Sequence, residues 1–148
     1  MTLTHQQLFM LPFLGHFVLI ALLYTWLTLE RQVAIFRREV KIGDFVRTGS
    51  DTPRAMRVAR NLANQFELPI FALFAALFIY FSNAVTLVDI AAAWLFLAGR
   101  LIHTVIQTLT TNVALRGIVY AITFIAVTIL MIRVAQLVLC LPASPISI

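Results

Sequence analysis

Charged residues are scarce in this chain. Only 11% of its 148 residues are Asp, Glu, Lys or Arg, whereas 61% are hydrophobic. An ordinary soluble domain carries about 25% charged residues, so this chain has too little polar surface to enclose its apolar side chains in water. The composition therefore predicts an integral membrane protein.

Cysteine and metal-ligand clusters are also lacking. Cys140 is the only cysteine, which excludes an intrachain disulfide and a multi-thiolate metal site. The histidines, His5, His16 and His103, have no metal-ligand spacing to one another or to carboxylates. The sequence has no basic groove interleaved with aromatic residues. We therefore expect neither a metal site nor a nucleic-acid partner.

Basic residues are missing from the first 30 positions. Signal peptides begin with positive charge and end at a small-residue cleavage site, and the chain shows neither pattern there. The first apolar segment, at about 8–29, is therefore predicted to be a retained membrane helix.

Three further apolar segments follow, at about 53–81, 87–109 and 113–141. Each reaches the roughly 20 residues that a helix needs to cross the hydrocarbon core. Helices also satisfy every backbone hydrogen bond within lipid. The sequence thus predicts an all-α protein, an integral membrane four-helix bundle forming a single domain over residues 1–148.

Polar residues mark the starts of these segments. Thr52, followed by proline, is typical of a helix N-cap. Thr86 with Asp89 forms a capping-box pattern, and Asn112 is a suitable cap for the last segment. The helix at 53–81 is longer than a bilayer requires, so its arginine-bearing start should project into water.

Positive charge is concentrated in one region. Eight of the eleven basic residues lie between Arg31 and Arg60, in and just after a polar loop at 30–52. Arg116 lies beside the connection between the last two segments, whereas the 82–86 connection and both termini lack Lys and Arg. The positive-inside rule predicts that both termini lie outside and both basic connections lie in the cytoplasm. We expect a multi-pass protein, of the inner membrane if the source is bacterial, with membrane lipids among its partners.

A polar stripe continues from this loop into apolar sequence. Arg57, Arg60, Asn64 and Glu67 are spaced by 3, 4 and 3 residues, which places them within about 80° of one another on a helix. A solvated helix end explains Arg57, but it does not explain a carboxylate beyond the membrane boundary. Charge inside a membrane segment usually has a function.

The third segment offers a partner for this acid. Arg100, His103 and Gln107 are again spaced by 3 and 4 residues. Counted from the outer helix ends, Glu67 and Arg100 both lie at a depth of about 21–22 Å. We therefore predict an intramembrane ion pair between Glu67 and Arg100, which either belongs to a ligand site or only fastens the two helices together.

Arginines near helix starts indicate the kind of ligand. Because a helix N-terminus carries partial positive charge, Arg54, Arg57, Arg60 and Arg116 oppose the local dipole. An anion bound by guanidinium and backbone N–H groups would explain them, as would positive-inside topology with anionic lipids. Arginines suit carboxylates, Asn64 and Gln107 suit amides, and Glu67 suits an ammonium group. A small zwitterionic peptide with two carboxylates satisfies all of these groups.

The same residues resemble a known family. The segment RVARNLANQFELP is similar to the helix-2 signature of the MAPEG superfamily, the membrane-associated proteins of eicosanoid and glutathione metabolism, with matches at Arg60, Asn64, Glu67 and Pro69. QVAIFRREV, at 32–40, resembles the end of helix 1 in leukotriene-forming members, where a pair of arginines stands. RLIHT, at 100–104, together with Arg116 and Tyr120, resembles the helix 3–4 region of microsomal prostaglandin E synthase.

The resemblance implies a homotrimer that binds glutathione between subunits near the cytoplasmic side. It implies that Arg116 stabilises the glutathione thiolate as the catalytic residue. It further implies a glutathione-dependent transferase or peroxidase acting on a lipophilic electrophile that enters from the bilayer. Carried over residue by residue, the contacts with the tripeptide are Arg37, Arg60, Asn64, Glu67, Arg100, His103, Arg116 and Tyr120. Gln107 is added as a predicted contact because its side-chain amide suits a peptide ligand.

The chain departs from the family at three positions. Leu68 and Gln107 stand where some members have tyrosine, and Gly117 stands where prostaglandin-type members have serine. Each change removes a hydroxyl from the expected site, so the particular eicosanoid activities are not expected to carry over. Two other functions stay open: a small-solute or lipid transporter that uses Glu67 and Arg100, and a non-catalytic membrane scaffold.

Two further residues have two interpretations each. His103 is either a hydrogen-bonded core residue or a glutathione contact. Arg133, within the last segment, either extends toward the outer membrane surface or pairs with Asp89.

Overall fold

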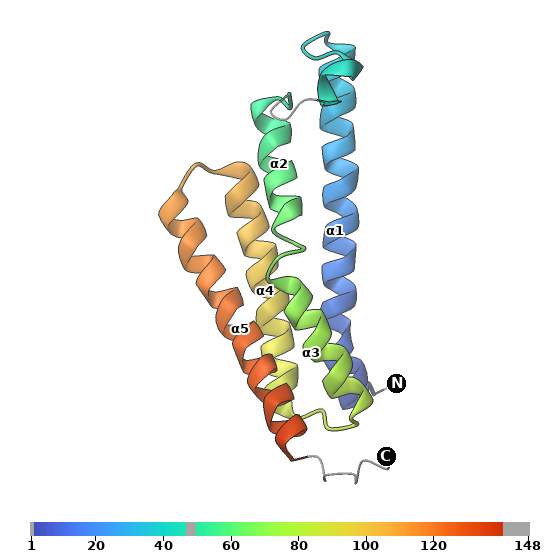
Figure 1. Cartoon of the computed structure of the whole chain (residues 1–148), viewed down its shortest axis with the longest axis vertical. Helices are drawn as coiled ribbons and strands as arrows, with labels where there is room; N and C mark the ends of the chain where they lie inside the picture. The colour runs from blue at the N-terminus through green and yellow to red at the C-terminus, as the bar shows by residue number, and fades with distance from the viewer. Residues whose placement is uncertain (1, 47–49, 141–148) are drawn as a thin grey trace, which may run out of the picture.

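The computed structural model describes residues 2–46 and 50–140. These residues form an elongated bundle of α-helices with no strand (Figure 1). The elements in chain order are α1 His5–Phe36, the 3-10 helix η1 Ile42–Val46, α2 Pro53–Ala63, α3 Pro69–Phe81, α4 Leu87–Leu109 and α5 Val113–Leu139. The start of α1 and the end of α5 lie at the same end of the bundle.

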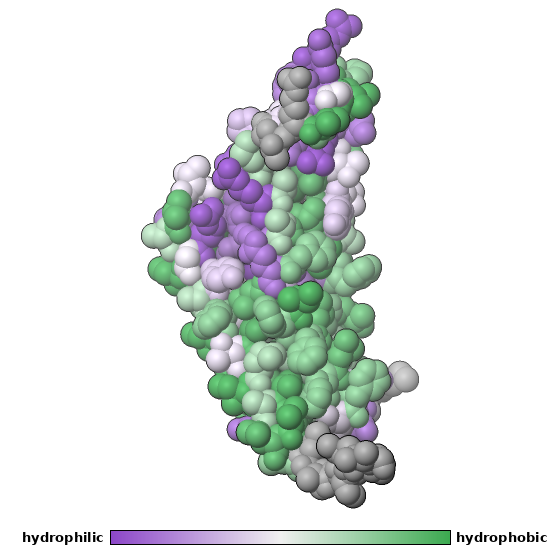
Figure 2. All heavy atoms as spheres, in the orientation of Figure 1, coloured by the Kyte–Doolittle hydropathy of each residue, from purple (hydrophilic) through white to green (hydrophobic). Residues whose placement is uncertain are grey.

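Three helices are long and apolar enough to span a membrane, namely α1, α4 and α5. Helix α1 has 32 residues, about 48 Å, which exceeds the roughly 30 Å of a hydrocarbon core. The half of the surface toward α3 in Figure 2 is hydrophobic, whereas hydrophilic side chains gather at the opposite end. This division agrees with an integral membrane protein.

The predicted continuous helix at 53–81 is wrong. Helix α2 ends at Ala63 and α3 begins at Pro69, so five α-helices replace the four expected within the described residues. Pro69 explains the break, because proline lacks an N–H and its ring clashes with the carbonyl four residues earlier. Helix α3 has 13 residues, about 20 Å, which is too short to cross the hydrocarbon core alone.

The predicted loop at 30–52 is also partly helical. Helix α1 continues through Glu30 to Phe36, and η1 forms Ile42–Val46. Arg31 explains part of this order, because its guanidinium donates two hydrogen bonds of 2.8 Å to the Asp51 carboxylate. This bidentate contact holds the pKa of Asp51 below its ordinary value and fastens the end of the loop to α1.

The predicted helix caps are confirmed. The Thr52 side chain accepts from the Ala55 amide, and Asn112 accepts from the Leu115 amide. Thr86 and Asp89 form the reciprocal capping box. Asp89 also accepts a hydrogen bond of 3.0 Å from Arg133, which selects the paired interpretation of that arginine.

Two apolar clusters hold the helices together. One contains phenylalanines of α1 and α4 packed on alanines of α3 and on α5, and the other joins the second half of α1 to α2. Ala72, Ala75 and Ala76 are buried on α3. Small residues of this kind let membrane helices approach closely, which favours dispersion contacts where lipid removes the hydrophobic driving force.

Gly99 marks a close approach of α4 to α5. A Cβ added at Gly99 would lie 2.5 Å from the Thr123 hydroxyl oxygen, whereas one added at Gly117 meets nothing within 4 Å. We predict that Gly99→Ala lowers stability by about 1–3 kcal/mol, because overpacking displaces buried Thr123. Gly117→Ala should be neutral or stabilising, because alanine favours helix. Thermal unfolding in detergent measures both variants.

Thr123→Ala tests the reason, because it removes the clashing oxygen. In the Thr123→Ala background, adding Gly99→Ala should therefore cost little or no stability. The double variant and Thr123→Ala alone should have nearly the same melting temperature. Equal melting temperatures for Gly99→Ala and wild type would contradict close packing at this contact.

Candidate functional site

A polar cleft opens between α2, α4 and α5. Its volume is about 530 Å³, within the range typical of small-molecule sites. Figure 2 shows hydrophilic side chains gathered over this part of the molecule, between α2 and α5. Seven of the nine predicted site residues line the cleft: Arg60, Asn64, Glu67, His103, Gln107, Arg116 and Tyr120.

The charged groups of the cleft are not neutralised by one another. Arg60, Glu67 and Arg116 form no ion pair with any residue in 2–46 or 50–140. The cleft therefore presents two guanidinium groups and one carboxylate to whatever occupies it.

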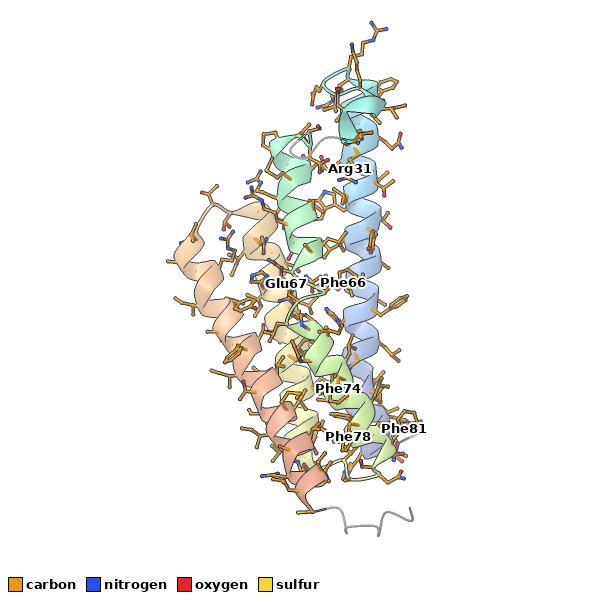
Figure 3. The ribbon with its side chains drawn as sticks, in the orientation of Figure 1. Arg31, Phe66, Glu67, Phe74, Phe78 and Phe81 are labelled. Atoms are coloured by element: carbon orange, nitrogen blue, oxygen red, sulfur yellow. The ribbon has the colours of Figure 1, made fainter. Side chains whose placement is uncertain are left out.

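The break between α2 and α3 sets the position of the acid. Figure 3 shows Glu67 at this break, between the two helices. Asn64 caps the end of α2, and its side-chain amide donates a hydrogen bond of 2.9 Å to Oε1 of Gln107 on α4. This bond fixes the orientation of both side-chain amides, and it links the wall of the cleft formed by α2 to the wall formed by α4.

Arg100 does not line the cleft, and its predicted ion pair with Glu67 does not form. The side chain is fully buried, and its Nε donates to Oε1 of Gln65 at 2.9 Å while Nη2 donates to the Asn64 carbonyl at 2.8 Å. The predicted depth match assumed a continuous helix. Because the helix opens at Asn64, a backbone carbonyl becomes the partner of the guanidinium.

Gln65 is the residue that sequence reasoning missed. Its Oε1 accepts from Arg100 and lies 3.0 Å from His16 Nε2 on α1, and its Nε2 donates to Asn61 and Thr104. One buried amide thus connects α1, α2 and α4 behind the cleft. Asn61 and Gln65 are four residues apart, so a second polar face on α2 was the available signal.

His103 and Tyr120 form one end of the cleft. Their ring centroids are 6.0 Å apart, and both residues line the cavity. The Nδ1 atom of His103 is buried and has no hydrogen-bond partner among the described residues. His103 is therefore buried and lines the cleft, but it is not the hydrogen-bonded core residue of the first interpretation within the described part of the chain, and its contact with glutathione stays a prediction.

Arg37 lies apart from the cleft. It lines a separate groove of about 590 Å³ between the ends of α1 and α2. Within a single chain, Arg37 is therefore not brought together with the other predicted site residues.

A family model matches this architecture. The model described as the MAPEG family aligns with residues 13–136, which extend from α1 into α5. The chain belongs to the MAPEG family. No curated protein and no solved structure gave a significant match.

The MAPEG match contains every residue that lines the cleft, as well as Arg37 and Arg100. Membership supports the integral membrane class that the apolar helices indicate. It leaves the reaction open, because the family includes glutathione transferases and peroxidases together with other members.

Arg100 should matter more for the fold of this MAPEG chain than Arg116. We predict that Arg100→Leu lowers stability by about 2–3 kcal/mol, because two hydrogen bonds to a charged group are lost and two acceptors stay buried. Arg116→Leu should change stability little, because Arg116 forms no ion pair among the described residues. Denaturation in mixed micelles measures the difference.

Hydrogen exchange locates the effect. Amides of residues 64–68 should exchange faster in Arg100→Leu than in Arg116→Leu. Equal stability and equal exchange in the two variants would show that Arg100 does not hold the break.

Proposed function

We propose that this protein is a membrane-bound, glutathione-dependent transferase or peroxidase that acts on a lipophilic electrophile. The observation that carries the proposal is the cleft lined by Arg60, Glu67 and Arg116, with no ion pair to any of them among the described residues. Glutathione complements these charges, because it has two carboxylates, one ammonium group and amides.

Different residues of the cleft are proposed to bind different groups of glutathione. Guanidinium groups such as Arg60 bind carboxylates with paired hydrogen bonds, and Glu67 attracts the ammonium group. The amide pair of Asn64 and Gln107 bridges the α2 and α4 walls of the cleft and is available to peptide groups of the ligand. A cavity of about 530 Å³ has room for a ligand of this size.

Arg116 is the group proposed to activate the thiol. A free thiol has a pKa of about 8.5, and a nearby cation lowers it, so that more thiolate is present at neutral pH. In a conjugation, the thiolate sulfur forms a bond to the electrophilic carbon and the electron pair moves to the leaving group. Tyr120 lines the same cavity, and its hydroxyl is the proposed hydrogen-bond donor to the departing atom.

Assembly as a homotrimer is part of the proposal. Arg37 lies in the α1–α2 groove and not in the cleft of its own chain. A cleft at a subunit boundary would receive Arg37 from a neighbouring copy, at the end of α1. The proposed trimer therefore explains why one predicted contact is missing from the isolated chain.

The transporter alternative loses its main support. It required Glu67 and Arg100 to act together within the membrane, whereas Arg100 is bound to Gln65 and to the Asn64 carbonyl. The proposed glutathione chemistry requires only the residues that line the cleft, and it does not require an ion pair between Glu67 and Arg100.

Glutathione binding is tested by thermal stabilisation of the purified protein in detergent. We expect millimolar glutathione to raise the melting temperature of wild type, because a ligand that binds only the folded state stabilises it. Arg60→Ala should abolish the shift. S-methylglutathione should give the same shift without supporting turnover. No shift at millimolar ligand would contradict the proposed function.

Thiol activation is tested with Arg116→Ala. We expect glutathione to bind this variant while turnover falls and the pH at which turnover reaches its maximum rises, because the thiol pKa is no longer lowered. Thiolate absorbance in the ultraviolet, recorded against pH, measures that pKa directly. An unchanged thiolate titration would assign Arg116 another role.

The shared site is tested by mixing subunits. Arg37→Ala and Arg60→Ala should each lose activity alone. Co-expression of the two variants should restore part of it, since some clefts then receive intact residues from both neighbours. Analytical ultracentrifugation of the mixture checks that trimers form, and trimers without recovered activity would place Arg37 outside the site.

A further inference from the structure

The groove between α1 and α2 is a second concave site, separate from the proposed glutathione cleft. Its volume is about 590 Å³, and the two cavities share no lining residue. Figure 1 shows α1 and α2 running side by side in this half of the molecule. The glutathione chemistry proposed above does not use this groove, except that the end of α1 carries Arg37.

The walls of the groove change character along α1. Trp26, Leu29 and Val33 form an apolar wall, and Arg37 follows one turn later. Leu29 and Val33 are 58% and 45% exposed, so they are available to a ligand. A site that is apolar at one end and cationic at the other fits an amphipathic molecule.

The groove crosses the predicted membrane boundary. Glu30 and Arg31 are the first charged residues on α1, after 25 residues that carry no Asp, Glu, Lys or Arg in the helix. Trp26 lies one turn before them, and its indole donates to Glu30 at 2.8 Å. Tryptophan is enriched at this level of the bilayer, where one side of the ring is apolar and the other is wet.

The cationic end has an unsatisfied group. The Nε of Arg57 is buried and has no hydrogen-bond partner, and Arg57 forms no ion pair within the described part of the chain. Glu30 is already neutralised by Arg54 at 2.8 Å. The lining contains three arginines and two glutamates, Arg37, Arg54, Arg57, Glu30 and Glu39, so it carries one net positive charge.

We propose that this groove binds a membrane phospholipid, with the headgroup phosphate held by Arg57 and one acyl chain lying along Trp26, Leu29 and Val33. Guanidinium groups form charge-assisted hydrogen bonds with phosphate oxygens, and a phosphate would satisfy the buried Arg57 donor. The apolar wall explains why the ligand is a lipid and not a free anion.

Native mass spectrometry of the full-length, delipidated protein in detergent tests this site. The probes are phosphatidylglycerol and a diacylglycerol with the same acyl chains, which lacks the phosphate. We expect phosphatidylglycerol to bind more tightly than diacylglycerol. Inorganic phosphate, added at the same concentration, should neither displace the lipid nor raise the melting temperature.

The matched variants are Val33→Glu and Val33→Gln. Both place a polar side chain of similar size on an exposed position of α1, and only Val33→Glu adds a charge that repels phosphate. Val33→Glu should weaken phosphatidylglycerol binding about fivefold relative to Val33→Gln, the effect of one charge near the membrane surface. Diacylglycerol binding should be the same in both variants.

Arg57→Leu and Arg38→Gly provide the second pair. Arg38 lies on the same side of the membrane but outside the groove, and its left-handed backbone, with φ of 59°, is one that glycine adopts more easily. Arg38→Gly should therefore remain folded and retain the lipid, whereas Arg57→Leu should lose it. Equal retention in both variants would overturn the proposal.

The proposal can fail separately from the proposed enzyme function. Loss of lipid selectivity in Val33→Glu, with the glutathione-induced thermal shift retained, supports a distinct lipid site. Equal binding of phosphatidylglycerol and diacylglycerol would overturn the phosphate contact. Stabilisation by inorganic phosphate alone would show a free-anion site and overturn the lipid assignment.

Discussion

The bond between the Arg100 guanidinium and the Asn64 carbonyl underlies the organisation of the molecule. A helix that opens among apolar helices exposes backbone groups that lipid cannot satisfy. Arg100 supplies the missing donor at 2.8 Å, and its Nε simultaneously holds the amide of Gln65. The α2–α3 break is therefore a fixed structure, and the residues that flank it, Asn64 and Glu67, keep a defined position in the cleft.

Much of the architecture was predictable, because each helix boundary has a local cause. Thr52, Thr86 and Asn112 cap helices through short-range hydrogen bonds that a sequence motif specifies fully. The break at 64–68 was missed although Pro69 was visible, because the hydrophobic pattern and the polar stripe both favoured continuity. Arg60, Asn64 and Glu67 of the stripe still line the cleft, whereas Arg57 lines the α1–α2 groove.

The partners of Arg100 and Gln65 were not predictable in the same way. Buried polar groups choose partners according to three-dimensional packing, and a depth count along two straight helices ignores a local opening of one of them. His16 shows the limit clearly: nothing near it in the sequence indicates that its ring meets Gln65, 49 residues later. Arg37 lies in the α1–α2 groove of its own chain, and its predicted contact with the ligand of the cleft depends on the proposed trimer.

Gly117 leaves open space in the wall of the cleft. It lines the cavity on α5 directly after Arg116, and the space where its side chain would stand is open. Because a Cβ at this position meets no atom within 4 Å, a small side chain can be introduced there without disturbing the contact of α5 with α4. A side chain at position 117 would therefore narrow the cleft while the packing of the helices stays unchanged.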